Sequence, residues 1–148
     1  MAWWDKLGMG IRVDAAARAL AAETFEFASV LGGDVLITQI IGRFTVITGG
    51  ASNVNLQFTP DVATAGVTAL CALANVNGLD VGDIVTITGV PGNPLLVTVT
   101  GAKPGLTVPL ILQAGGIESV VSAASGAAEI AWSLWYIPLS DAAYVVGV

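Results

Sequence analysis

The sequence predicts an all-β protein: a single-domain β-sandwich, with a jelly roll as the specific architecture, preceded by a short N-terminal arm. Three observations lead to this class. Apolar runs rich in Val, Ile and Thr recur at roughly 8–12-residue spacing, about nine or ten in all, and Gly, Pro and Asn separate them. No long run of helical period lies between them. The chain of 148 residues fits one domain, which we divide into an arm over residues 1–22 and a sandwich over residues 23–148.

Residues 1–22 differ from the rest of the chain. Trp3 and Trp4 are followed by two glycines and then by an Ala-rich run over residues 14–22. Because Ala, Arg and Leu favour helix, this run could form about two helical turns, which are too short to be stable alone. We therefore expect an arm that becomes ordered against another surface.

The strands of the sandwich follow from Thr24. Phe25 and Phe27 alternate with polar or small residues, which is typical of a half-buried strand. Residues 32–34, Gly-Gly-Asp, predict a turn, and Gly42 marks a bulge or a close approach of another chain segment. A strand at residues 35–41 is expected to continue over 43–48, and further strands are expected at residues 54–58, 65–74, 84–88, 95–100, 106–112, 117–121, 129–139 and 143–148.

The composition is unusually apolar. Hydrophobic residues make up 55% of the chain and charged residues only 11%, compared with about 25% charged residues in typical soluble domains. The surplus of apolar surface favours contact with other protein chains. The formal charge of −6 disfavours binding to nucleic acid. Two charge-free stretches, residues 62–79 and 84–102, are interrupted by Asn, Gly and Pro, so we expect no membrane-spanning helix.

The residue types needed for common catalytic sites are missing. The chain has no histidine, which excludes Ser-His-Asp triads, Cys-His pairs and histidine-based metal sites. Cys71 lies in an apolar run and is expected to be a buried thiol rather than a nucleophile. Glycan cleavage would need two neighbouring carboxylates, and nothing in the sequence brings two together. The candidates for such a pair are Asp61, Glu118, Glu129 and Asp141.

One polar cluster could hold a metal ion. Asn75, Asn77, Asp80 and Asp83 offer the oxygen ligands that calcium prefers. Their spacing does not match an EF-hand loop, and no Glu stands at the bidentate position. A tight turn entering a strand explains the same residues, and we favour it over calcium. We therefore expect no enzyme activity, no cofactor and no metal site.

Aromatic residues mark a second group of candidate functional positions. In a strand, Trp132 and Tyr136 lie on one face and Trp135 on the other, so both faces are apolar. Burial in the core on one side and contact with another subunit on the other is the favoured interpretation, and Phe25 and Phe27 belong to the same set. A platform on which a sugar ring stacks is the alternative.

Several stretches carry a resemblance to a known family. Residues 24–42 read TFEFASVLGGDVLITQIIG, and residues 131–146 read AWSLWYIPLSDAAYVV. Between them stand NLQFTP at 55–60, VTALCAL at 67–73 and VTITG at 85–89. Together these stretches resemble the small structural proteins encoded beside the capsid genes of tailed bacteriophages, in particular capsid decoration (cement) proteins. The resemblance covers about residues 24–148. Ala131 and Ala142 depart from it, since a basic residue and a glycine are usual there.

The resemblance implies a structural protein of the virion. It would be made in the host cytoplasm, sit on the capsid exterior and stabilise the head by bridging major capsid subunits. Its partners would be the phage major capsid protein and further copies of itself in a homotrimer, with no nucleic acid and no membrane. The alternative is a tail, baseplate or head-fibre appendage module that binds a host glycan, and a glycan-cleaving enzyme is the third and least favoured possibility.

The expected arm supplies the capsid contacts in this hypothesis. Lys6, Arg12 and Arg18 would pair with acidic groups on a capsid subunit, while Trp3 and Trp4 would fill an apolar pocket. Deleting residues 2–18 would then leave a folded β body with weaker attachment. The alternative is a segment that folds back and covers an edge strand of its own sandwich.

Overall fold

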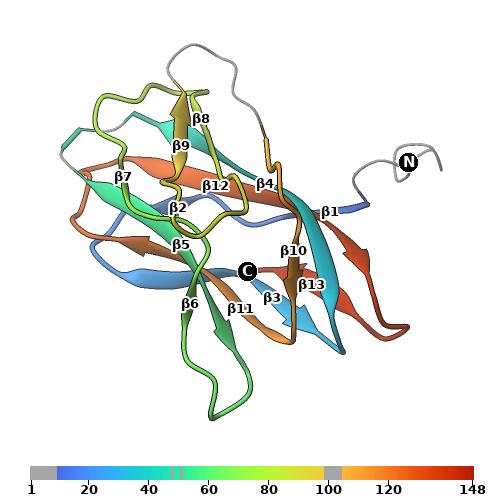
Figure 1. Cartoon of the computed structure of the whole chain (residues 1–148). Coiled ribbons are helices and arrows are strands. Elements are labelled where there is room, and N and C mark those ends of the chain that lie inside the picture. Colours follow the sequence, from blue (N-terminus) through green and yellow to red (C-terminus); the bar gives the residue numbers. More distant parts are fainter. Residues whose placement is uncertain (1–9, 48, 51, 99–104) are drawn as a thin grey trace.

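The computed structural model describes residues 10–47, 49–50, 52–98 and 105–148, and it has two β-sheets packed face to face (Figure 1). The part described contains strands and turns, and no helix in it is long and apolar enough to cross a membrane. The first sheet has seven strands: β1 (Ile11–Asp14), β2 (Arg18–Ala19), β4 (Val35–Val46), β8 (Ile84–Thr86), β9 (Leu96–Thr98), β10 (Leu110–Leu112) and β12 (Glu129–Pro138).

The second sheet has six strands, and the paired strands of both sheets are antiparallel. Its main path runs in the order β13-β3-β11-β5-β6, which places β13 and β6 at opposite edges. The predicted all-β sandwich is confirmed, and jelly-roll connectivity stays a prediction. The strands of the second sheet are β3 (Thr24–Leu31), β5 (Asn53–Pro60), β6 (Thr68–Ala69), β7 (Ala74–Asn75), β11 (Gly115–Val121) and β13 (Tyr144–Gly147).

The core lies between the sheets and is built from alternate residues of each long strand. In β12 the side chains of Ile130, Trp132, Leu134 and Tyr136 are buried, while the residues between them face outward. Strand β5 contributes buried side chains in the same alternating manner, and β3 does so except at Phe27 and Ala28, which are both buried where its pairing with β11 shifts register. The two sheets therefore bury one face each.

Gly42 lies where three side chains converge on β4. A Cβ atom at this position would stand 2.7 Å from both Ile130 Cδ1 and Val85 Cγ2, and 2.8 Å from Trp132 Cζ3. The register shifts of the β4–β12 pairing occur elsewhere, between Glu129 and Ile130 and between Trp135 and Tyr136. Of the two roles expected for Gly42, the structure shows the close approach.

Residues 10–22 belong to the sandwich. Ile11–Asp14 forms β1 along the outer edge of β12, residues 18–19 pair with the same strand, and Leu20 is fully buried. The Ala-rich run forms no helix because its backbone bonds to β12, as when Ala15 N donates to Trp132 O at 2.9 Å. From Gly10 onward the fold-back alternative therefore describes the segment expected as an arm. Residues 1–9 lie outside the described residues.

Residues 65–74 do not form the single strand that their apolar content suggested. Two short strands, β6 and β7, flank a connecting stretch in which Leu70 and Cys71 are buried. Residues 65–69 are exposed, so the apolar content of this run does not come from a half-buried strand. The chain before β6 projects as a loop over residues 61–67, at the bottom of Figure 1.

Candidate interaction surfaces

Four of the predicted aromatic residues lie in the core. Phe25, Phe27, Trp132 and Tyr136 are each at most 5% exposed. They contribute to stability and are not accessible to a partner. Trp135 is half-buried and points to the outer face of the first sheet, opposite Trp132 on the same strand, as the period of a strand requires.

Arg12 is held over Trp135 on this outer face. The two residues are register partners across β1 and β12, and the Arg12 guanidinium carbon lies 5.4 Å from the centroid of the Trp135 ring. Arg12 Nε also donates to Asp14 Oδ1 at 2.8 Å. The hydroxyl of Ser133 donates to the same carboxylate oxygen at 2.6 Å. Chiefly through this Ser133 bond, and also through Arg12, the pKa of Asp14 lies below its usual value.

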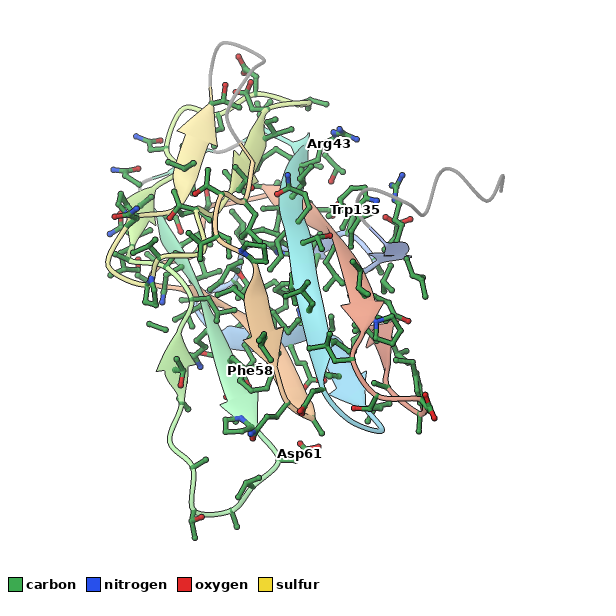
Figure 2. The ribbon with its side chains drawn as sticks, turned by 45° about the vertical axis from the view of Figure 1, so that its right-hand side comes forward. Arg43, Phe58, Asp61 and Trp135 are labelled. Atoms are coloured by element: carbon green, nitrogen blue, oxygen red, sulfur yellow. The ribbon has the colours of Figure 1, made fainter. Side chains whose placement is uncertain are left out.

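Arg43 reaches the same area from β4. Across the β4–β12 pairing, Arg43 is opposite Ala131 and Ile41 is opposite Ser133. Figure 2 shows Arg43 and Trp135 on neighbouring strands. A depression of about 250 Å³ lies here, which we call the arginine depression; its lining residues are Arg12, Ile41, Arg43, Ser133 and Trp135. Arg12 and Trp135 are among the site residues predicted from the sequence, whereas Arg43 is not.

Arg43 forms no ion pair within the described ranges, in contrast to the two other arginines. Arg18 bonds to Glu23 at 3.0 Å and lies 4.5 Å from the Phe25 ring centroid, so its own chain engages it. The remaining predicted capsid contacts, Trp3, Trp4 and Lys6, lie outside the described residues. Of the two expected capsid contacts that the structure describes, Arg12 lines the arginine depression and Arg18 is paired with Glu23.

A second hollow, of about 360 Å³, lies beside the loop that connects β5 and β6. Phe58, Leu70 and Leu112 contribute apolar lining, while Asp34 and Gln113 are polar. Figure 2 shows Phe58 near the end of β5, with Asp61 beginning the projecting loop. Ile111 also lines this hollow and is 68% exposed, so an apolar side chain stands open to solvent here.

Cys71 is a core residue, as expected. Its side chain is buried, and Leu56 N donates a hydrogen bond to its Sγ atom at 3.2 Å. Burial raises the pKa of the thiol to about 11, because the thiolate would lose its hydration. The thiol therefore stays protonated at neutral pH and is a poor nucleophile.

The side chains of the Asn75–Asp83 cluster bond to their own backbone. Asn75 Oδ1 accepts from Asn77 N at 2.7 Å, and Asp83 Oδ2 accepts from Asp80 N at 2.9 Å. These are the contacts of tight turns. Among the described residues no group of three His, Cys, Asp or Glu side chains is arranged to hold a metal ion.

Glu118 has an acidic neighbour that the sequence did not indicate. It lies opposite Glu26 in the β3–β11 pairing, on the outer face of the second sheet. Thr59 Oγ1 donates to Glu118 at 2.9 Å, Gln57 Nε2 also donates to it, and Ser29 donates to Glu26. These hydrogen bonds come from short side chains on a sheet surface, so both carboxylates have polar partners within the sandwich.

Comparison with known proteins gives no relative: no family model matches the chain, and neither does any curated protein or solved structure.

Proposed function

We propose that this chain is a virion structural protein, a capsid decoration protein that stabilises a phage head by bridging major capsid subunits. It would assemble as a homotrimer on the capsid exterior. The stretches that resemble decoration proteins support the proposal, since they include most of β3, β4, β12 and β13. They therefore include strands of both sheets.

The observation that carries the proposal is the presence of two separate apolar surfaces, one at the loop between β5 and β6 and one at the β13 edge of the second sheet. The loop surface consists of Val62 and Val67, which are 52% and 56% exposed, and Ile111 of β10, which is 68% exposed and lines the hollow beside this loop. The edge surface consists of Tyr144, Val146 and Val148 at and beside β13, which are 48%, 43% and 61% exposed. A bridging protein needs two separate contact surfaces, and apolar side chains at such surfaces are typical of permanent assemblies.

Binding to heads that lack this protein tests the proposal. We expect the purified full chain to sediment with such heads in many copies, and light scattering to give a mass near three times 14.9 kDa. Val67→Asp and Val146→Asp should each reduce binding, because each places a charge in one apolar surface. Val81→Asp is the matched control, since Val81 is 62% exposed and belongs to neither surface. A monomer that stays in the supernatant would contradict the proposal.

The alternative, a tail, baseplate or head-fibre module that binds a host glycan, has one observation in its favour. Trp135 lines a surface depression, and aromatic rings are common in sugar sites. Mass spectrometry of heads separated from tails distinguishes the two functions. A decoration protein is found on heads in many copies, whereas an appendage module is found on tails or in few copies.

A further inference from the structure

The arginine depression combines two guanidinium groups with one carboxylate. Arg12, Arg43 and Asp14 give this cluster a net charge of +1, in a chain whose formal charge is −6. At physiological ionic strength, charges more than about 8 Å apart are largely screened, so the charged groups at the depression contribute most to its electrostatic potential. The depression therefore favours an anionic group.

Arg12 is preorganised for such a ligand. Its guanidinium is fixed by the Asp14 carboxylate on one side and by the Trp135 ring below it. Asp14 binds the Nε atom, and among the described residues no hydrogen bond engages the two Nη atoms. Those atoms are the donors that bind planar oxyanions, and a fixed side chain loses little entropy when it uses them.

Arg43 supplies the second cation, and it forms no ion pair with another described residue. It is exposed on β4, and the nearest acidic residue along the strand pair, Glu129, accepts from Thr45 Oγ1 at 3.5 Å instead. Ile41, two residues before Arg43 on β4, gives the depression an apolar lining. An anion bound here would accept hydrogen bonds from the Arg43 guanidinium, and no ion pair among the described residues would have to break.

Two features favour an acidic side chain of a protein over a sugar. The guanidinium of Arg12 lies over the Trp135 ring, so that face of the ring is not free for a pyranose to stack on. The volume of about 250 Å³ also falls below the roughly 300–1,000 Å³ of typical small-molecule sites, which suits one side chain. Trp and Arg are the residue types that dominate protein–protein contacts.

We propose that the arginine depression binds an Asp or Glu side chain of an acidic protein segment, with Arg43 and the Nη atoms of Arg12 as the carboxylate-binding groups. The inference rests on the proposed function in one respect, namely that the major capsid protein supplies this segment. The chemistry of the site itself does not depend on that identity.

The site is tested by NMR titration of the isotope-labelled full chain with a capped peptide of Gly and Glu. We expect the Nε–H signals of Arg12 and Arg43 and the indole N–H signal of Trp135 to shift together. The same peptide with Gln in place of Glu should leave them unmoved. Arg43→Gln should weaken the peptide affinity at least tenfold, and Arg43→Lys should weaken it less, because it keeps the charge and loses the fork.

Arg18→Gln is the matched control, because it removes the same charge from an arginine already paired with Glu23. An equal loss of affinity in Arg18→Gln would overturn the proposal, since binding would then follow net charge alone. Titration with glucuronic acid and N-acetylneuraminic acid forms a separate arm. Binding of either sugar without binding of the peptide would also overturn it, in favour of a glycan.

Head binding separates the site from the function. If the peptide binds but Arg43→Gln decorates heads as well as the unchanged chain does, the site stands and the capsid protein is not its ligand. If the peptide fails to bind while the chain decorates heads, the site proposal is wrong and the proposed function stands.

Discussion

The rings of Phe27 and Trp132 stack in the interior of the sandwich, with centroids 5.1 Å apart and planes inclined by 19°. Phe27 belongs to β3 in the second sheet and Trp132 to β12 in the first. Both side chains are almost completely buried. The pair therefore joins the two sheets directly, at a point where each strand also has neighbours on both sides.

Replacing Trp132 should reveal the strength of this contact. We expect Trp132→Ala to lower the free energy of unfolding by about 3–5 kcal/mol, because it removes a large buried ring. Trp132→Phe should cost only about 1–2 kcal/mol, since Trp132 Nε1 has no hydrogen-bond partner among the described residues to be lost. Denaturant unfolding of both variants, with Phe27→Leu alone and combined, would measure the coupling. Additive losses would show that the stacked pair has no special weight.

Gly42 should tolerate no side chain. We expect Gly42→Ala to destabilise the protein by about 1–3 kcal/mol, because the added methyl group would overlap Ile130, Val85 and Trp132. Gly49→Ala is the control, since a Cβ atom there meets nothing within 4 Å. Its stability should change by no more than about 0.5 kcal/mol. Equal melting temperatures for the two variants would contradict the close approach.

Truncation should separate the first nine residues from the segment that covers β12. A chain lacking residues 2–9 keeps every strand pairing described here and should unfold like the full chain. A chain lacking residues 2–22 should lose about 1.5–3 kcal/mol from Leu20 alone and expose the edge of β12, with aggregation as the result. Thermal melting and size-exclusion chromatography measure both effects. A soluble, equally stable chain after the longer deletion would refute the role of this segment.

Cys71 should make stability fall at alkaline pH. The pKa of the thiol is about 11 in the folded chain and 9.0 without burial, so between these values the unfolded chain releases a proton that the folded chain keeps. The stabilising contribution is complete below pH 9 and is lost as the pH rises through 11. We expect a loss of roughly 2–3 kcal/mol over this window relative to Cys71→Ser, which does not titrate. If the free energy of unfolding of the two proteins changed with pH in the same way, the burial of the Cys71 thiol would be contradicted.

A chelator should leave the melting temperature unchanged. The turn side chains of Asn75 and Asp83 already bind backbone N–H groups, so a calcium ion would have to displace those hydrogen bonds. Calorimetry with EDTA and then with excess calcium checks this. A shift of several degrees in either direction would restore the calcium interpretation, since a ligand bound by the folded chain alone stabilises it.

The strands that alternation predicts are those with one buried face. Phe25 and Phe27 in β3, and Trp132 and Tyr136 in β12, show a period of two because the core accepts every second side chain. Ile11–Asp14 has no such pattern, since three of its four residues are exposed. Its place in the sheet comes from backbone bonding to β12, which leaves no mark in local sequence.

Only part of the arginine depression can be predicted from the sequence. Alternation placed Trp135 on the face opposite Trp132, and composition drew attention to Arg12. Arg43 and Trp135 line the same depression because of the register of β4 against β12, and 92 residues separate them in the sequence. One residue of slip would turn Arg43 toward the core, and no short stretch of sequence specifies that register.

The pairing of β1 with β12 also constrains when the first sheet can fold during synthesis of the chain. Residues 11–14 leave the ribosome long before residues 133–136, their partners in the ladder. Until then both β1 and one side of β4 have open backbone groups, which can recruit strands of neighbouring nascent chains. The pairing of β1 with β12 therefore forms late. Because it joins residues that are far apart in the sequence, folding should be slow. A circular permutant that joins the end of the chain after β13 to the segment before β1, with new ends in the loop between β5 and β6, would make this contact local and should fold faster.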